Sequence, residues 1–244
     1  MKVYQSDDFD VELKGDNSPL TLADRKAHKA ITDILELVGI PVLSEEGKSI
    51  PFEERKNWKQ FWLVDPLDGT KEFIKRNDEF TVNIALIENG YPIMGVIYVP
   101  VSNELYFGDS QHGSNKTVIE DIEDLPTIID RAYSLPYEQE DRAFTAVVSR
   151  SHMSPETEDF LSSKLSTLNH KHVDYISRGS SLKICMVAEG KADVYPRFGP
   201  TMEWDTAAGH AIAKFAGKKV YRVDDGEELR YNKEELFNPY FIVE

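Results

Sequence analysis

Four apolar residues run directly into a pair of aspartates in the segment Phe61-Trp62-Leu63-Val64-Asp65-Pro66-Leu67-Asp68-Gly69-Thr70. A short, continuous apolar run predicts a buried strand, which we expect to stop at Asp65. Pro66 keeps the residue before it extended, and Gly69 permits a tight turn. Such a turn can aim both carboxylates and the Leu67 carbonyl at one point in front of a sheet.

An all-oxygen cluster of this kind suits a hard divalent cation. Mg²⁺ in particular uses few carboxylates and completes its shell with water and substrate phosphate. The residues from Thr70 to Ile74 can begin a helix whose free N–H groups face the same point and suit a phosphate. The alternative is a plain strand-to-helix turn with an aspartate cap, and the segment alone leaves it open.

Elements on both sides of this segment predict a sheet with helices on it. Apolar residues at steps of three and four predict a helix over 21–38, with a capping box formed by Thr21 and Asp24. Alternation and turn signals, including Asn89-Gly90, predict further strands. These strands span 41–43, 81–87, 93–99 and 105–107.

The second half of the chain has a different pattern. The polar, acidic region from about 109 to 142 is the best linker candidate, and after it strands and helices alternate, which implies an α/β layer. We expect strands over 144–148, 173–176, 192–195 and 219–222, a helix beginning at Ser154, and helices over 180–188 and 205–216. We therefore expect an N-terminal α+β domain over residues 1–120 and a C-terminal α/β domain over 121–244.

Charge and composition exclude several classes of function. The chain of 244 residues has 43 acidic and 28 basic side chains, a net charge of −15. Such a chain will not track a nucleic-acid backbone or settle on an anionic membrane, and it repels acidic substrates unless something local inverts the field. No apolar run approaches the roughly 20 residues of a membrane span. With no apolar signal-peptide core and a single cysteine, Cys185, we expect a cytoplasmic protein.

Competing chemistries leave no motif in the sequence. It contains no phosphate-binding P-loop, no serine nucleophile elbow and no zinc-protease helix. Asp65 and Asp68 are three residues apart, whereas a covalent aspartyl-phosphate nucleophile is expected two residues from its partner. A metal-activated water is therefore the better attacking group.

Further carboxylates and a few cations stand at other strand ends and helix starts. Ser44-Glu45-Glu46-Gly47 ends a strand, and Asp205 is expected as the N-cap of a helix; a solvated acidic turn and a simple cap are the alternatives. Ser180, Lys183 and Arg197 can hold an anion, with arginine offering a bidentate fork, unless they are ordinary surface groups. His152 follows another strand and can line a ligand or be structural.

Together these motifs resemble the lithium-sensitive, Mg²⁺-dependent phosphatase family that includes inositol monophosphatase. The resemblance covers nearly the whole chain and rests on Ser44-Glu45-Glu46, on residues 65–70 and on Trp204-Asp205-Thr206-Ala207-Ala208-Gly209, in the family's order. Residues 80–83, 179–183 and 195–209 look like those of the CysQ-type 3′(2′),5′-bisphosphate nucleotidases.

The resemblance implies an αβαβα layered sandwich and a set of site residues. It assigns as metal ligands Glu45, Asp65, the Leu67 carbonyl, Asp68 and Asp205. Asp24 and Thr70, together with Glu45, would orient and deprotonate the attacking water, and Gly69 and Thr70 would hold the scissile phosphate. Ser180, Lys183 and Arg197 would grip a second phosphate, with His152 near the nucleotide.

The resemblance also implies an activity. It is hydrolysis of the 3′-phosphate of adenosine 3′,5′-bisphosphate to AMP and phosphate, in sulfur assimilation, with about two or three Mg²⁺ ions and inhibition by Li⁺. We expect a monomer or homodimer with no nucleic-acid polymer or membrane as partner. The alternatives are an inositol or sugar monophosphatase and a catalytically silent metal- or nucleotide-binding domain.

Family members carry an additional helix before the segment where this chain begins. Either the start of this sequence is truncated or misassigned, or that first helix is absent, and without it we expect apolar surface to be exposed on the N-terminal layer.

Overall fold

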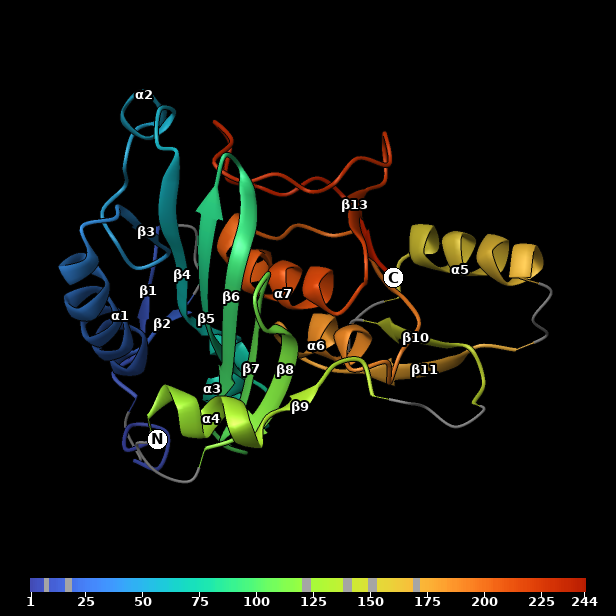
Figure 1. Ribbon diagram of the computed structural model, residues 1–244, viewed down its shortest axis with the longest axis horizontal. Coiled ribbons are helices and arrows are strands. Elements are labelled where there is room, and N and C mark those ends of the chain that lie inside the picture. The colour runs from blue at the N-terminus through green and yellow to red at the C-terminus, as the bar shows by residue number, and fades with distance from the viewer. Residues whose placement is uncertain (7–8, 16–18, 120–123, 138–141, 149–152, 169–171) are drawn as a thin grey trace.

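Five layers stack across the molecule in the order helix, sheet, helix, sheet, helix (Figure 1). The computed structural model describes residues 1–6, 9–15, 19–119, 124–137, 142–148, 153–168 and 172–244. From left to right in Figure 1 the layers are α1, the large sheet, α6 with α7, the smaller sheets, and α5. The αβαβα class expected from the sequence is therefore confirmed.

The large sheet has seven strands in the order β3-β4-β5-β6-β7-β8-β9. Its strands are β3 (Val42–Ser44), β4 (Gln60–Asp68), β5 (Thr81–Glu88), β6 (Tyr91–Val99), β7 (Glu104–Asp109), β8 (Gly113–Val118) and β9 (Tyr133–Ser134). Only the β3–β4 pair is parallel. Positive φ angles at Asn89 and Gly90 form the tight turn between β5 and β6 that the sequence predicts.

The polar region 109–142 is not a linker, contrary to expectation. It supplies β8 and β9 to the sheet and carries helix α4 (Leu125–Arg131). Ser114, Asn115, Lys116 and Thr117 are buried in β8 although all four are polar. Strand pairing satisfies their backbone groups, and the side chains of Asn115 and Lys116 donate to the His112 carbonyl and to Glu189. The expected domain boundary at residue 120 lies outside the described residues and stays a prediction.

Helix α7 (Glu203–Phe215) forms the centre of the molecule and packs on the large sheet through glycines. A Cβ atom added at Gly95 of β6 would lie 2.4 Å from the Ala208 carbonyl oxygen and 2.7 Å from Ala211 Cβ. On its other side α7 meets α6 (Leu182–Ala188), where Gly209 lies against Ile184. The absence of side chains at these glycines lets the helix approach both neighbours closely.

Two smaller sheets and an outer helix complete the C-terminal part. β10 (Thr145–Val148) pairs in parallel with β11 (Asp174–Ser177), and α5 (Pro155–Leu168) covers this side. β14 (Phe241–Val243) lies between β12 (Tyr195–Arg197) and β13 (Val220–Arg222). The sequence predicts β10, β11, α5 and β13, but it places the strand before Arg197 at 192–195, which overlaps β12 only at Tyr195, and it misses β14, which is buried at the end of the chain.

The N-terminal layer consists of short elements and one long helix. Helix α1 (Leu22–Leu35) continues into a short 3₁₀ turn, η1 (Glu36–Val38), and ends at Gly39, as predicted. The short elements are β1 (Glu12–Leu13), β2 (Pro19–Leu20), α2 (Phe52–Arg55) and α3 (Thr70–Lys75).

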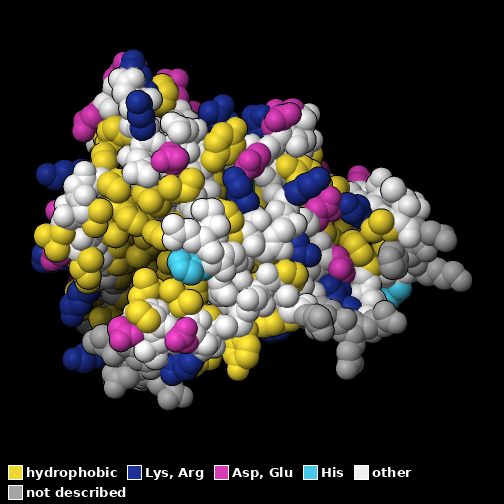
Figure 2. All heavy atoms as spheres, viewed as in Figure 1, with side chains coloured by type: hydrophobic (Ala, Val, Ile, Leu, Met, Phe, Trp, Pro, Cys, Tyr) yellow, Lys and Arg dark blue, Asp and Glu magenta, His cyan; other side chains and the backbone are white. Residues whose placement is uncertain are grey.

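Apolar surface is exposed on this layer. Ile34, Leu37 and Val38 at the end of α1 are exposed, although the apolar spacing predicts that this side of the helix packs inward. Figure 2 shows apolar side chains around a hollow beside α1. Met1, Val3 and Ala27 line an apolar groove between the N-terminus and the start of this helix. Among the described residues, no helix has both the length and the apolarity needed to cross a lipid bilayer.

Replacing Gly95 with alanine should destabilise the fold. The new methyl group would meet backbone of α7 that cannot move alone, and overpacking of this kind costs about 1–3 kcal/mol. Thermal unfolding should show Tm lower by about 2–4 °C for each kcal/mol. Gly15→Ala is the control, because nothing lies within 4 Å of the position of its Cβ. Equal Tm values for the two variants would contradict the packing argument.

Candidate metal and phosphate site

The end of β4 carries the first two acidic residues of the site. β4 does not stop at Asp65 as expected but runs to Asp68, with a bulge between these residues. Asp65 pairs with Asn83 of β5 and Asp68 pairs with Thr81, so both aspartates lie on the same face of the sheet. In a regular strand residues three apart point to opposite faces, and the bulge removes that difference.

A tight turn then leads from β4 into α3. Gly69 adopts a φ of 92°, in the left-handed region that favours glycine. A Cβ atom there would lie 2.9 Å from the Glu79 carbonyl oxygen, so the turn also leaves no room for a side chain. The glycine therefore permits the close approach of the Asp68–Thr70 turn to the segment before β5.

Asp24 reaches this turn from the first turn of α1. The predicted capping box is present: one carboxylate oxygen of Asp24 accepts from the Thr21 backbone N–H at 2.7 Å and from the Thr21 hydroxyl. The other oxygen accepts from the Thr70 hydroxyl at 3.2 Å. Asp24 is thus buried, fixed by its own helix start, and hydrogen-bonded to the residue that begins α3.

Glu45 stands at the end of β3, next to the end of β4. Its backbone N–H donates to the Val64 carbonyl at 3.0 Å, which holds the two strand ends together. Lys14 Nζ lies 2.7 Å from Glu45 Oε1 and 2.5 Å from Glu46 Oε1. We had not considered Lys14, which brings a cation to a cluster that is otherwise acidic.

The carboxylates of this cluster perturb one another. Burial raises the pKa of Asp65 well above its usual range, and the charges of Glu45, Asp68 and Asp205 raise it further. Burial also raises the pKa of Asp205 to about 8, again with a contribution from Asp68. Like charges gathered out of water disfavour ionisation, so these groups favour a cation beside them.

The donor set fits a hard divalent cation. Asp65, Asp68, Asp205, Glu45 and the Leu67 carbonyl offer oxygen alone, the donor that Mg²⁺ prefers. Within the described ranges, no three acidic, histidine or cysteine side chains lie close enough to form a complete cage. Water and substrate oxygen would have to complete the coordination, as is usual for Mg²⁺.

Asp205 lies in α7, but not at the position we expected. The helix begins at Glu203, so Asp205 is the third helical residue rather than the N-cap. Its carboxylate accepts from the backbone N–H of the cap residue, Met202, at 2.8 Å. The N-terminus of α7 is anchored by Glu203, whose carboxylate accepts from the backbone N–H groups of Asn232 and Lys233.

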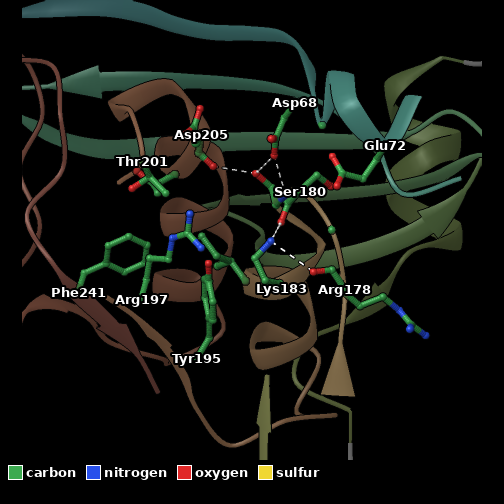
Figure 3. A pocket seen from close by; sticks show the side chains of 15 residues that line it. Asp68, Glu72, Arg178, Ser180, Lys183, Tyr195, Arg197, Thr201, Asp205 and Phe241 are labelled. Atoms are coloured by element: carbon green, nitrogen blue, oxygen red, sulfur yellow. Dashed lines mark hydrogen bonds between the residues drawn. The ribbon is translucent and has the colours of Figure 1, made fainter. Parts of the chain in front are cut away.

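A cavity of about 180 Å³ joins Asp68 and Asp205 to the predicted anion-binding residues. In Figure 3 Asp68 and Asp205 lie on one side of this cavity, with Lys183, Arg197 and Tyr195 on the other. Ser180 and Arg197 each contribute a buried atom, Oγ and Nε, that has no hydrogen-bond partner among the described residues. Unsatisfied buried donors of this kind suit a ligand that accepts hydrogen bonds.

Local backbone strain accompanies these donors. Ser180 adopts a φ of 45°, a left-handed conformation that costs free energy for a residue with a Cβ atom. Lys183 Nζ donates to the Ser180 carbonyl at 2.8 Å and lies 5.7 Å from the centre of the Tyr195 ring. The lysine thus helps to hold the strained turn that carries the serine.

The electrostatics of the cavity also favour an anion. Burial, with a smaller contribution from Arg197, lowers the pKa of Lys183 to about 8, although Asp68, Glu72 and Asp205 act in the opposite direction. A cation that is destabilised by burial gains from a negative partner. Lys183 and Arg197 therefore form a positive end of the cavity opposite the carboxylates.

Most of the expected site residues lie around this one cavity and turn. Asp24, Glu45, Asp65, Asp68, Thr70 and Asp205 are linked by the contacts and charges given above, and Ser180, Lys183 and Arg197 line the adjoining cavity. His152 lies outside the described residues, so its role stays a prediction. We had not singled out Ser181 or Tyr195. The sequence signal for Ser181 is a pair of polar residues, Thr81 and Asn83, on the buried face of β5: buried polar groups need hydrogen-bond partners, and Ser181 is the partner of Asn83.

Comparison with known proteins gives a consistent result. The model of the inositol monophosphatase family matches residues 1–239. The 3′(2′),5′-bisphosphate nucleotidase CysQ of Escherichia coli K12 is 47% identical over 100% of this chain and 92% of that protein. The corresponding protein of Haemophilus influenzae is 37% identical, over 96% of this chain and 82% of its own length.

Solved structures extend the comparison to the fold. CysQ from Bacteroides thetaiotaomicron, described as a bacterial member of the inositol monophosphatase family, is 54% identical with a TM-score of 0.89, covering 100% of this chain and 90% of its own. An inositol monophosphatase/NADP phosphatase in complex with Mg²⁺ and phosphate has a TM-score of 0.68 at 19% identity, over 97% and 81% of the two chains, and shares the fold. By its sequence and its architecture, this chain belongs to the inositol monophosphatase family.

Proposed function

We propose that this chain is a Mg²⁺-dependent 3′(2′),5′-bisphosphate nucleotidase that hydrolyses adenosine 3′,5′-bisphosphate to AMP and phosphate. The observation that carries the proposal is the second, positively charged end of the cavity. Ser180 Oγ and Arg197 Nε lie there, next to Lys183, and find no hydrogen-bond partner in the described part of the chain. A substrate with two phosphates would fit this cavity, with one phosphate at the metal ions held by the carboxylates and the other hydrogen-bonded to these donors.

The relatives support the same substrate class. Curated relatives that are 47% identical over the whole chain are 3′(2′),5′-bisphosphate nucleotidases. The family is generally Mg²⁺-dependent, and the donor set described above fits that ion. Mg²⁺ at the carboxylates would polarise the ester phosphate and lower the pKa of a bound water.

The residues around the turn have separate tasks. Glu45, Asp65, Asp68, Asp205 and the Leu67 carbonyl would hold the metal. The Thr70 hydroxyl donates a hydrogen bond to Asp24, so it could take a proton from the attacking water while passing its own proton to the Asp24 carboxylate.

Substrate binding would involve both sides of the cavity. The turn at Gly69 and Thr70 would hold the scissile phosphate, while Ser180, Lys183 and Arg197 would hold the second phosphate with charge-assisted hydrogen bonds. His152 remains a proposed nucleotide contact. Two or three metal ions, inhibition by Li⁺, a monomeric or homodimeric state and a cytoplasmic location are further parts of the proposal.

An inositol or sugar monophosphatase is the runner-up, and the cationic end of the cavity distinguishes it. The double variant Lys183→Ala/Arg197→Ala should lower kcat/KM for adenosine 3′,5′-bisphosphate by about 100-fold or more, because each charged hydrogen bond contributes about 1.5–3 kcal/mol. Phosphate release from inositol 1-phosphate, measured alongside, should change far less. Equal losses on the two substrates would reject the nucleotidase assignment.

The metal site is tested separately through Asp68. The Asp68→Asn variant should lose at least about 100-fold in Mg²⁺-dependent phosphate release, since metal ions supply several kcal/mol of transition-state stabilisation. Asp33→Asn is a matched control, because Asp33 is exposed on α1 and pairs with Lys29. If the wild-type protein releases no phosphate from any candidate substrate, the silent binding domain is the correct interpretation.

The pH dependence should report Lys183. Since burial lowers the pKa of Lys183 to about 8, the ammonium is lost above that pH and can no longer hold a phosphate. A profile of kcat/KM for adenosine 3′,5′-bisphosphate should therefore fall above about pH 8. This fall in kcat/KM should be absent for adenosine 3′-monophosphate, which has no second phosphate. It should also be absent in the Lys183→Arg variant, because arginine stays protonated. If kcat/KM of the Lys183→Arg variant still falls above about pH 8, a group other than Lys183 is responsible for the fall.

A further inference from the structure

Ser181 lies between the proposed metal ligands and the proposed phosphate donors. It is buried at the start of α6, next to Ser180 in sequence. Its backbone N–H donates to Asp68 Oδ2 at 2.6 Å, and its Oγ lies 2.8 Å from the same oxygen. The Ser181 Oγ also lies 2.7 Å from the Asp205 carbonyl oxygen, so one residue contacts both β4 and α7.

The hydrogen-bonding capacity of Ser181 allows it to bridge these two elements. A serine hydroxyl has one proton to donate. Two acceptors, Asp68 Oδ2 at 2.8 Å and the Asp205 carbonyl oxygen at 2.7 Å, share this single hydroxyl proton. The lone pairs of Oγ accept from Asn83 Nδ2 at 2.9 Å, and Asn83 Oδ1 accepts from the Thr81 hydroxyl at 2.9 Å. The serine is therefore fixed from three directions.

The contacts also select one oxygen of Asp68. Ser181 N, Ser181 Oγ and, at 3.4 Å, Asn83 Nδ2 all approach Oδ2. Among the described residues, no hydrogen bond to Oδ1 is recorded. With Oδ2 occupied by donors, the carboxylate is oriented so that Oδ1 is the oxygen available to a cation.

We propose that Ser181 is a positioning residue that couples the metal site to the site of the second phosphate. The inference rests on the proposed function, since Asp68 and Asp205 are its metal ligands. A cation that draws Asp68 and Asp205 into place would also fix Ser181, and with it the adjoining turn that carries Ser180 and Lys183. By thermodynamic reciprocity, a phosphate held by that turn would strengthen cation binding by the same factor.

Isothermal titration calorimetry without turnover tests this coupling. Mg²⁺ is titrated into the protein alone, and AMP, whose phosphate would occupy the Lys183 side, is titrated with and without Mg²⁺. In the wild type Mg²⁺ should tighten AMP binding by about 5-fold or more. Ser181→Ala should weaken Mg²⁺ binding by about 10- to 100-fold and bring the coupling factor close to one.

Two further variants separate positioning from folding. Ser181→Thr keeps the hydroxyl and should restore both Mg²⁺ affinity and coupling, whereas Ser181→Cys keeps the shape with a weak donor and should resemble Ser181→Ala. Ser114→Ala is the matched control, because Ser114 is a buried serine whose hydroxyl has no partner among the described residues.

Wild-type Mg²⁺ affinity and coupling in both Ser181→Ala and Ser181→Cys would overturn the inference while leaving the proposed function intact. A wild-type protein that binds no Mg²⁺ and releases no phosphate would overturn both. If Ser181→Ala does not fold, the comparison of Ser181→Cys with Ser181→Thr decides.

Discussion

Mutual repulsion among the carboxylates at the ends of β3 and β4 and the start of α7 is the constraint on which this structure depends. Asp65 is buried with 1% of its surface exposed, and the charges of Glu45, Asp68 and Asp205 all act on it. Like charges that act on one another out of water disfavour a folded state in which all of them are ionised. The rest of the fold must hold these groups together against that repulsion.

The packing of α7 supplies much of that restraint. The helix lies between the large sheet and α6, with contacts too close for any side chain at Gly95. Its first turn is anchored by the buried Glu203, so Asp205 cannot move away from Asp68 without disturbing the core. The close packing of α7 in the core therefore stabilises the fold and offsets the repulsion among the carboxylates of the site.

The sequence predicts the site better than the elements that form it. The acidic residues are recognisable because each stands at a strand end or helix start. The bulge that puts Asp65 and Asp68 on one face is not, because it depends on pairing with β5. Asp205 satisfies a backbone N–H as well from the third helical position as from the cap, so the sequence does not separate the two. β8 was missed because its burial depends on strand pairing and on tertiary contacts, such as that between Lys116 and Glu189, which composition does not reveal.

The net charge of −15 combines two sets of acidic groups, those on the surface and those of the carboxylate cluster. Most acidic groups are on the surface, but Asp65, Asp68, Asp205 and Glu45, when ionised, would create a local field that repels a phosphorylated nucleotide. Lys14 neutralises only part of that field, at Glu45 and Glu46, while Lys183 and Arg197 act at the opposite end of the cavity. In the proposed enzyme, about two bound divalent ions would bring roughly four positive charges and would reverse the sign of the field where the scissile phosphate is proposed to bind. The acidity that excludes polyanions is thus compatible with a small phosphorylated substrate, provided that the cation arrives first or with it.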